Sequence, residues 1–325
     1  MPERDIFITG AAGYVGRNLL RHFIARGHRV IGLVRTAEAA DRVRSWGGKP
    51  VLGDMLNANL VPLMAGADML IHTAASVDHG PGSTADFVNP EGTRRVLDAA
   101  RQAYVGKAIH ISTDSVLQDG HPLCNVDETT PYPSRPAGAY SAGKAEAEKV
   151  ARRAAVSGQH VVILRPRMVW GRDDTTALPT LVEAVESGKF AWISGGGYRS
   201  STMHIANLCH VVGLALDRGR SGEIYHVSDG PARTFRETVT GLLASQGIPA
   251  PTKVVPRGVV RTVARVGDAI HRASAGRYRG PMSYQDYATS AVEITLDTWK
   301  AERELDYEPL MAWEDGLAEL RSYQA

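Results

Sequence analysis

Apolar segments of strand length alternate with segments of helical periodicity through the first half of this 325-residue chain. Strands separated by helices imply right-handed crossovers and a parallel sheet with helices on both faces. We therefore predict an α/β fold built on a doubly wound parallel sheet. The expected strands span residues 5–10, 29–35, 49–54, 68–75, 107–113 and 160–166, and the expected helices span residues 14–27, 38–46, 92–103 and 138–155.

The second half of the chain loses this alternation. We predict a dinucleotide-binding domain over residues 1–166 and a smaller, interleaved C-terminal substrate-binding lobe over residues 167–325. One strand of the second half is expected to return to the main sheet. The expected elements after Pro166 are helices at 178–187, 205–217 and 235–246 and this returning strand at 222–229.

Composition excludes several classes of protein. A net charge of +2, from 37 basic and 35 acidic residues, gives no reason to expect a nucleic-acid partner. Cys124 and Cys209 are too few for a disulfide framework or a thiolate metal site, and we predict no metal. The first ten residues lack a signal-peptide core, and no apolar run approaches the ~20 residues of a membrane span. We therefore expect a soluble, cytoplasmic protein.

A glycine-rich turn, TGAAGYVG at 9–16, joins the first expected strand to the first helix. Gly10 permits the tight turn, Gly13 lets a pyrophosphate approach the backbone, and Gly16 lets the helix pack close to the strand. In this context the triplet predicts a Rossmann dinucleotide site, the alternative being a plain strand-to-helix turn. The predicted contacts of the turn are Gly10, Ala12, Gly13, Tyr14, Val15 and Gly16.

The end of the second expected strand distinguishes the two dinucleotides. An acidic residue there would bind a free ribose 2′-hydroxyl. Val34 occupies that position and Arg35 and Thr36 follow it, and a guanidinium suits a 2′-phosphate. We predict NADP(H), with Arg42 as a second contact; the alternative is that Arg35 is an ordinary solvated arginine.

Further cofactor contacts are expected after the third, fourth and last strands of the first half. The Asp54 carboxylate can accept a hydrogen bond from an adenine amino group. Small residues after the fourth strand let a cofactor lie against the backbone, whereas His72 is expected to be a packed core histidine. The predicted contacts of this group are Asp54, Met55, Thr73, Ala74, Ala75, Pro166 and Val169.

Tyr140 and Lys144 lie four residues apart in GAYSAGK, on one face of an expected helix. Such a pair is either chemical machinery or an ordinary surface pair. The segment STDSV at 112–116 ends the fifth expected strand. Because ligands of open parallel sheets bind at the carboxyl ends of strands, a hydroxyl there and Tyr140 can converge on one cofactor.

The segments TGAAGYVG, HTAA, NPEGT, STDSV, YSAGK and LRPRMVWG, in this order, resemble the extended short-chain dehydrogenase/reductase family. With LDYEP and WEDGLAEL near the C-terminus, the resemblance covers nearly the whole chain. It implies that Tyr140 is the general acid/base, with a pKa lowered by a nearby ammonium and by the cofactor ring. It also implies that Lys144 binds the cofactor ribose and that Thr113 binds the substrate oxygen, with Ser112 as the alternative. Asn89 is expected to support this network from the start of its helix.

The branch of the family is indicated by the second half of the chain. Residues 195–216 resemble the 3β-hydroxysteroid dehydrogenase and dihydroflavonol reductase-like branch, with Asn207 where many sugar enzymes have Asp. Met168 replaces a diphosphate-contacting Asn of epimerases, and Ser115 replaces an acid of dehydratases. We expect an NADP(H)-dependent ketone/alcohol oxidoreductase acting on a bulky apolar substrate. The expected substrate contacts are Val77, Asp114, Ser115, Arg167 and Met168.

Two other functions remain open at this point: a sugar-nucleotide epimerase or dehydratase, and a non-catalytic NADP(H)-sensing protein. The resemblance also implies a homodimer through the helices at about 92–104 and 138–155.

Residues 256–280 predict a basic amphipathic helix. Val259, Val263, Val266 and Ile270 share one face, and Arg261, Arg265 and Arg272 cluster on another. Such a helix either lies on a membrane surface or packs its apolar face into the lobe.

Overall fold

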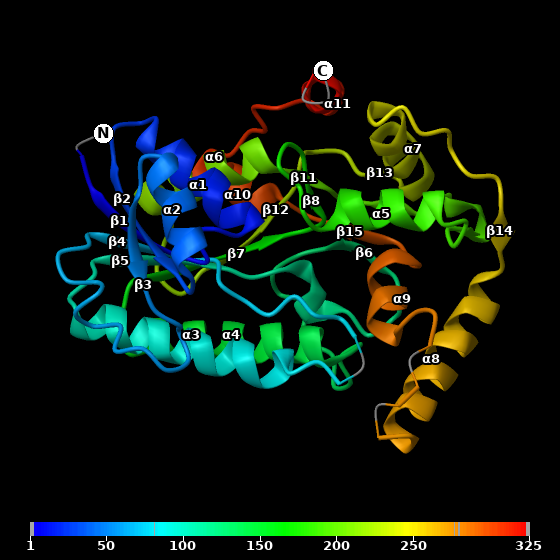
Figure 1. The fold of residues 1–325 in the computed structure, drawn as a ribbon, viewed down its shortest axis with the longest axis horizontal. Coiled ribbons are helices and arrows are strands. Elements are labelled where there is room, and N and C mark those ends of the chain that lie inside the picture. The colour runs from blue at the N-terminus through cyan, green and yellow to red at the C-terminus, as the bar shows by residue number, and fades with distance from the viewer. Residues whose placement is uncertain (1–2, 81, 276, 279, 323–325) are drawn as a thin grey trace.

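The protein contains a seven-stranded parallel sheet that runs through the left half of Figure 1. The computed structural model describes residues 3–80, 82–275, 277–278 and 280–322. All neighbouring strands of this sheet are parallel, which confirms the predicted doubly wound α/β fold. From one edge to the other the strands are β3 (Lys49–Leu52), β2 (Arg29–Val34), β1 (Asp5–Thr9), β4 (Met69–His72), β5 (Lys107–Ile111), β7 (Val161–Pro166) and β12 (Ile224–Val227).

Helices cover both faces of the sheet because successive strand side chains point in opposite directions. In β1, Ile6 and Ile8 pack in one core cluster and Phe7 in the other. The first cluster lies under α1 (Tyr14–Ile24), α2 (Ala37–Ser45), α6 (Ile205–Arg218) and α10 (Trp299–Leu305). The second lies under α3 (Ala85–Gln102) and α4 (Ala139–Val156), which run side by side along the lower edge of Figure 1.

The smaller lobe is interleaved with the main sheet, as predicted. Its four-stranded sheet contains β6 (Leu123–Val126), a segment of the first half, paired with β15 (Ile294–Leu296), while β12 of the second half lies in the main sheet. The remaining strands of the lobe are β8 (Val169–Trp170), β9 (Trp192–Ile193), β10 (Arg199–Ser200), β11 (Met203–His204), β13 (Arg233–Thr234) and β14 (Val254–Val255). Its helices are α5 (Ala177–Glu186), α7 (Phe235–Ser245), α8 (Arg257–Ala273), α9 (Tyr284–Ser290) and α11 (Trp313–Ser322), and the 3-10 turns of the chain are η1 (Asp114–Leu117) and η2 (Ser194–Gly196).

One expectation about a helix is wrong, and one of the two alternatives for another helix is excluded. Helix α3 begins at Ala85 rather than at residue 92, and it carries Pro90 inside its second turn. Proline is typical of the first helical turn, whereas Pro90 lies in the second turn of α3. The apolar face of α8 does not pack into the lobe: Val259 is 53% exposed and Ile270 is 44% exposed. Residues 276 and 279, at the end of the segment expected to be amphipathic, lie outside the described residues.

None of the helices in the described part of the chain combines the length and the hydrophobicity needed to cross a bilayer.

Candidate active site

The turn after β1 forms a cradle that only glycine can build. Gly10 has φ +69°, and a Cβ atom on it would lie 2.8 Å from Thr73 Oγ1. A Cβ on Gly16 would overlap the Gly10 carbonyl, so this glycine brings α1 against the turn. Gly13 is the N-cap residue of α1, and no described side chain bonds the N–H groups at this end of the helix. No acidic residue occupies the first turn. The uncovered N–H groups and the positive end of α1 fit a pyrophosphate.

The carboxyl ends of β1 and β4 are tied together beside this cradle. Thr73 Oγ1 donates to the Thr9 carbonyl at 2.7 Å, and Ala74 N donates to Thr9 Oγ1 at 3.2 Å. His72 is a buried core histidine, as expected, because its ring nitrogens lie 2.7 Å from Thr9 Oγ1 and 3.0 Å from Thr93 Oγ1. Burial and the Lys144 charge lower the pKa of His72 to about 3. The imidazole is therefore neutral at the back of the site.

Arg35 is exposed immediately after β2, next to the buried Val34. Thr36 caps α2, its hydroxyl accepting a bond from Ala39 N at 3.2 Å. Asp54 accepts from Leu56 N at 2.9 Å in the turn after β3. A Cβ on Gly92 would lie 2.5 Å from Met55 Cε, so this glycine makes room for Met55 against α3. Arg35 thus stands at the strand end where an adenosine ribose would lie.

Tyr140 and Thr113 meet at the carboxyl edge of the sheet. Tyr140 lies in the first turn of α4 and Thr113 caps η1 after β5, and the Thr113 hydroxyl lies near enough to the Tyr140 phenol to act on its pKa. Burial and the Asp114 charge raise the pKa of Tyr140 to about 12, although the Thr113 hydroxyl acts in the opposite direction. The expected lowering of this pKa is thus not a property of the protein alone. The Tyr140 pKa is raised because burial removes water from the phenolate and because the negatively charged Asp114 lies nearby.

Lys144 lies one turn along α4 from Tyr140 and is buried. Its Nζ donates to the Ile111 carbonyl, the last residue of β5, at 2.7 Å. Burial lowers the pKa of Lys144 to about 8, while Glu148 acts to raise it. The ammonium is therefore held at the end of β5, on the same face of α4 as Tyr140.

Ser112, the alternative to Thr113, faces a different network. Its hydroxyl donates to Glu148 Oε2 at 2.5 Å. Arg165 donates to both oxygens of the same carboxylate, and Tyr132 donates to Oε1 at 2.7 Å. The structure thus places Thr113, and not Ser112, against Tyr140. Sequence reasoning missed Glu148, although its position four residues after Lys144 puts it on the same helical face.

Asp114 and Arg167, both expected to contact substrate, form a buried ion pair. Arg167 Nη1 donates to Asp114 Oδ2 at 2.8 Å. Arg167 also donates to Ser200 Oγ at 3.2 Å and to the Thr289 carbonyl at 2.9 Å. The pair therefore connects the ends of β5 and β7 to β10 and α9 of the lobe.

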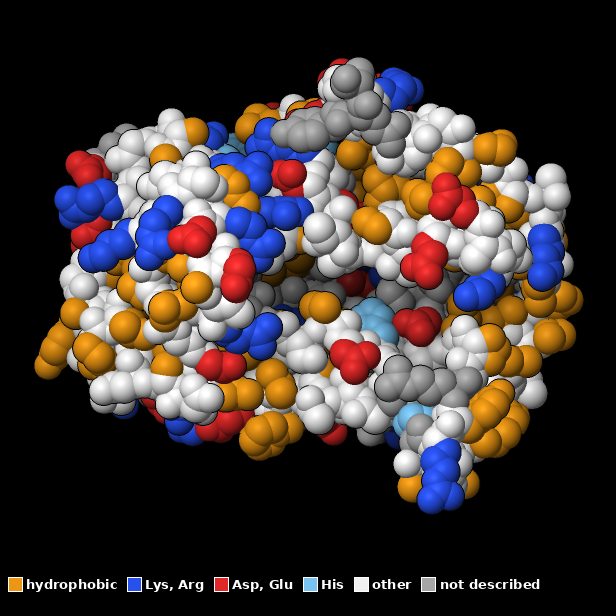
Figure 2. Space-filling view, in the orientation of Figure 1, with side chains coloured by type: hydrophobic (Ala, Val, Ile, Leu, Met, Phe, Trp, Pro, Cys, Tyr) orange, Lys and Arg blue, Asp and Glu red, His pale blue; other side chains and the backbone are white. Residues whose placement is uncertain are grey.

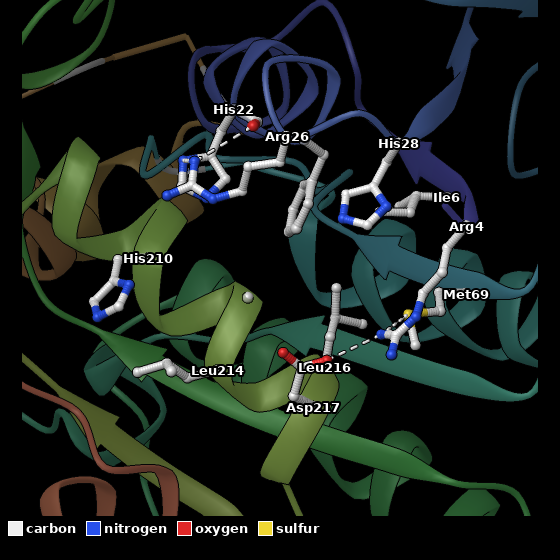
Figure 3. Close-up of a pocket in the computed structure, with 12 residues that line it drawn as sticks. Arg4, Ile6, His22, Arg26, His28, Met69, His210, Leu214, Leu216 and Asp217 are labelled. Atoms are coloured by element: carbon white, nitrogen blue, oxygen red, sulfur yellow. Dashed lines mark hydrogen bonds and ion pairs between the residues drawn. The ribbon is translucent and has the colours of Figure 1, made fainter. Parts of the chain in front are cut away.

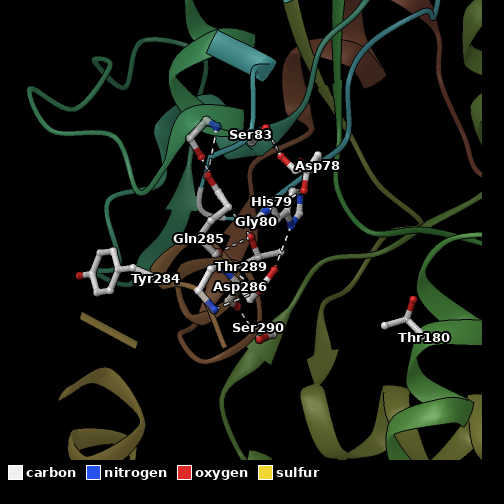
Figure 4. Close-up of polar contacts among 12 residues, drawn as sticks. Asp78, His79, Gly80, Ser83, Thr180, Tyr284, Gln285, Asp286, Thr289 and Ser290 are labelled. Carbon is white, nitrogen blue, oxygen red and sulfur yellow. Dashed lines mark hydrogen bonds and ion pairs between the residues drawn. The ribbon is translucent and has the colours of Figure 1, made fainter. Parts of the chain in front are cut away.

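A loop after β4 covers Tyr140, a feature without a sequence motif. The ring of His79 lies 4.5 Å from the Tyr140 ring, centroid to centroid, and His79 Nδ1 lies 3.2 Å from Asp286 Oδ1 of α9 (Figure 4). Asn89 steadies the same loop, accepting from Ser76 N at 2.7 Å and donating to the Ser76 carbonyl at 3.1 Å. Asn89 lies in the second turn of α3, not at its start as expected.

The other expected substrate and cofactor positions surround this edge. Val77 is 62% exposed on the loop after β4. Pro166 ends β7 and Val169 opens β8. Between them Met168 has φ +40° and packs on the cluster of Trp170 and its neighbours.

Two residues used to assign the branch of the family are buried. Ser115 lies in η1, and Asn207 of α6 accepts hydrogen bonds from Leu310 N and Met311 N of the C-terminal segment. The space-filling view is hollowed between the two halves of the molecule (Figure 2).

A cavity of about 210 Å³ lies at the opposite edge of the sheet, lined by Arg4, His22, His210 and Asp217 among others (Figure 3). Arg4 pairs with Asp217 at 3.1 Å across it. Burial lowers the pKa of His22 to about 3. This cavity is at the amino ends of β1 and β4, so it is separate from the edge where ligands of such sheets bind.

Comparison with known proteins identifies the family. The sequence profile of the NAD dependent epimerase/dehydratase family matches residues 6–228. The chain belongs to this family. The resemblance inferred from the motifs is thereby confirmed, and the chain is an oxidoreductase of the extended short-chain dehydrogenase/reductase type.

Its relatives lie in the expected branch of the family. A 4-hydroxy-2-methyl-3-oxo-4-farnesyl-3,4-dihydroquinoline-1-oxide ketoreductase from Stigmatella aurantiaca is 41% identical over 318 residues, covering 97% of this chain and 95% of the relative. A 3-beta-hydroxysteroid dehydrogenase from Mycolicibacterium neoaurum is 29% identical, and the match covers 98% of this chain and 90% of the relative. Among solved structures, the dTDP-glucose 4,6-dehydratase DesIV from Streptomyces venezuelae, with NAD bound, has a TM-score of 0.75 at 26% identity. The match covers 98% of this chain and 97% of DesIV.

Proposed function

We propose that the chain is an NADP(H)-dependent reductase that interconverts a ketone and a secondary alcohol on a bulky, largely apolar substrate. The observation that carries the proposal is the convergence of Thr113, Tyr140 and Lys144 at the carboxyl edge of the sheet, with Lys144 one turn along α4 from Tyr140 and bonded to the last residue of β5. A bound NADP(H) would supply a hydride to the carbonyl carbon or accept one from the alcohol.

Tyr140 is the proposed general acid. Its raised pKa keeps the phenol protonated at neutral pH, which is the form that donates to a carbonyl oxygen. The Thr113 hydroxyl can donate to the same oxygen as negative charge develops on it. Oxidation of an alcohol would need the phenolate, which burial and Asp114 disfavour.

Arg35 supports NADP(H) over NAD(H). It is exposed beside the buried Val34, at the position where an acid would bind a free ribose. A guanidinium there can form a charge-assisted bond to a 2′-phosphate. Lys144 is the proposed ligand of the nicotinamide ribose, and the cradle around Gly10, Gly13 and Gly16 would hold the pyrophosphate.

The apolar substrate class is supported by the relatives and by the residues around the edge. The relatives named above include a farnesyl-quinoline ketoreductase and a hydroxysteroid dehydrogenase. Val77 is exposed beside the site, and Met168 packs in an apolar cluster. A sugar-nucleotide dehydratase or epimerase is the second candidate, favoured by the likeness to DesIV. Ser115 opposes it, because that position lacks the acid expected for elimination.

A substrate panel tests the proposal directly. NADPH oxidation is followed with farnesylated quinolones, 3-oxosteroids and small aliphatic ketones, and product formation is followed with dTDP-glucose and UDP-glucose. We expect NADPH consumption with the apolar ketones and none with the sugar nucleotides. Turnover of a sugar nucleotide without net NADPH consumption would establish the second candidate instead.

The proposal also includes a reducing, cytoplasmic setting and a homodimer through α3 and α4. The exposed Cys124 and the buried Cys209 are both free thiols, which suits such a setting. The mass of the protein by light scattering tests the dimer.

A further inference from the structure

Helix α8 exposes a row of apolar side chains to solvent. We call the row of Val259, Val263, Val266 and Ile270 the α8 stripe; their exposed fractions are 53%, 41%, 50% and 44%. Their spacing of four, three and four residues places them on one side of the helix. The helix packs against the lobe through another side, where Ala264, Gly267 and His271 are buried. It extends away from the body of the molecule at the lower right of Figure 1.

The side of α8 opposite the stripe is strongly basic. It carries Arg257, Arg261, Arg265 and Arg272, against a single acid, Asp268. The Asp268 carboxylate accepts a bond from Tyr284 N at 3.0 Å, so it already serves the junction with α9. In a chain whose net charge is only +2, this helix is a local concentration of positive charge. Hydrophobic side chains and Lys or Arg side chains meet at this end of the surface in Figure 2.

We propose that α8 binds the surface of an anionic lipid bilayer, with the α8 stripe in the interface and the arginines facing the headgroups and water. A helix with an apolar side, a basic polar side and low mean hydropathy is the kind that lies in the plane of a membrane. The basic residues supply electrostatic attraction to anionic lipids over about a Debye length.

A second copy of the chain is a poorer occupant of the stripe. Four side chains over a helix of 17 residues amount to little more than two heptads. Stable dimers bury about 800 Å² on each partner, far more than one such row provides. Pairing through the stripe would also make no use of the charges of Arg261 and Arg272, whereas an anionic surface uses both sides of the helix.

Helix α9 links α8 to the active site. Arg265 Nη2 donates to Tyr284 OH at 3.0 Å, which joins the two helices. The next residues of α9 reach the site: Gln285 Nε2 donates to Ser141 Oγ at 2.9 Å, and Asp286 pairs with His79 over Tyr140. A bilayer under α8 would therefore be separated by α9 alone from the residues that lie against Tyr140. The benefit of this position, access to a membrane-dissolved apolar ketone, rests on the proposed function; the binding itself does not.

Co-sedimentation with vesicles tests the inference without cofactor or substrate. The full chain is mixed with vesicles of phosphatidylcholine, or of phosphatidylcholine and phosphatidylglycerol in equal amounts. We expect binding to the anionic vesicles and weak or no binding to the neutral ones. Val263→Glu should weaken binding about tenfold or more. It removes apolar area that would be buried in the bilayer, and it adds a negative charge that anionic lipids repel. Arg261→Gln with Arg272→Gln should weaken it about fivefold or more.

Leu310→Glu is the matched control, since Leu310 is 66% exposed between α10 and α11 and lies outside both the α8 stripe and the helices proposed for the dimer. It should bind vesicles like the unmodified protein. Absence of vesicle binding, or equal binding by Val263→Glu, would overturn the inference. So would a dimer that Val263→Glu converts to a monomer without any vesicle binding, because the stripe would then be an interface between copies. Reduction of a small water-soluble ketone, measured separately, reports on the proposed function whatever the vesicles show.

Discussion

Arg167 Nη1 lies 2.8 Å from Asp114 Oδ2, and each side chain is only 3% exposed. The pair stands directly beside Tyr140, whose pKa the Asp114 charge helps to raise. It also holds the lobe to the main sheet through the Arg167 bond to the Thr289 carbonyl. The same pair therefore contributes to the packing of the lobe and, through Asp114, to the pKa of Tyr140.

Arg167→Met should destabilise the protein by about 3–5 kcal/mol, because it leaves the Asp114 carboxylate buried without its partner. The double variant Asp114→Asn with Arg167→Met should cost less than Arg167→Met alone, since no unpaired charge remains. Urea unfolding measures the free energy of unfolding of the double variant and of the two single variants, Arg167→Met and Asp114→Asn. A double variant whose cost equals the sum of the two single costs would show that the charges are not coupled.

Tyr140→Phe should lower kcat by about 10²–10⁴-fold, because the ring remains and only the proton donor is lost. The Kd for NADPH, measured by fluorescence titration, should change less than about twofold. If the variant kept its activity, Tyr140 would not be the general acid. If the biological role also survived the loss of activity, a cofactor-sensing function would gain support.

Arg35→Asp should shift the cofactor preference from NADP(H) to NAD(H). The substitution removes the cation proposed for the 2′-phosphate and supplies an acid for a free ribose. The ratio of kcat/KM for NADPH and NADH measures the change. Equal use of both cofactors by the unmodified protein would contradict the proposed role of Arg35.

Lys144→Met should raise the stability of the protein at pH 7 by up to about 3 kcal/mol, less the hydrogen bond to Ile111. Lys144 has a pKa of about 8 in the folded chain and about 10.5 when unfolded, so the unfolded state binds more protons between these values. The cost of the buried ammonium is thus full below pH 8 and fades as the pH rises towards 10.5. Urea unfolding near pH 7 and pH 10 should show the advantage of the variant shrinking; an advantage that stays constant with pH would contradict it.

The affinity for NADPH should fall as the pH rises through about 8, because the free protein then loses the Lys144 ammonium proposed for the ribose. Tyr140, with a pKa of about 12, stays protonated over this range and should not contribute. Titrations between about pH 7 and 10 measure the effect. Lys144→Met should bind NADPH more weakly and without this pH dependence.

Much of the fold was predictable because its determinants are local. Strand-length apolar runs, helical periodicity and the glycine-rich turn act over a few residues, and they placed the seven-stranded sheet and the cradle around Gly10. The start of α3 was missed because Pro90 lies inside the helix, against its usual position in a first turn. The choice between Ser112 and Thr113 also could not be made, since it depends on which side of a strand end each hydroxyl faces.

The amino-acid sequence by itself determined the doubly wound sheet, the family and the spacing of Tyr140 and Lys144 on one helical face, because these follow from periodicity and short-range motifs. Only the tertiary structure decided which charged side chains form ion pairs and which surfaces remain exposed to solvent. The Asp114–Arg167 pair joins residues 53 positions apart, and the raised pKa of Tyr140 comes from that packing. Likewise the sequence showed that α8 is amphipathic, but its exposed side depends on what the rest of the chain packs against it. Burial is a property of the assembled fold, and the electrostatics of this site follow from burial.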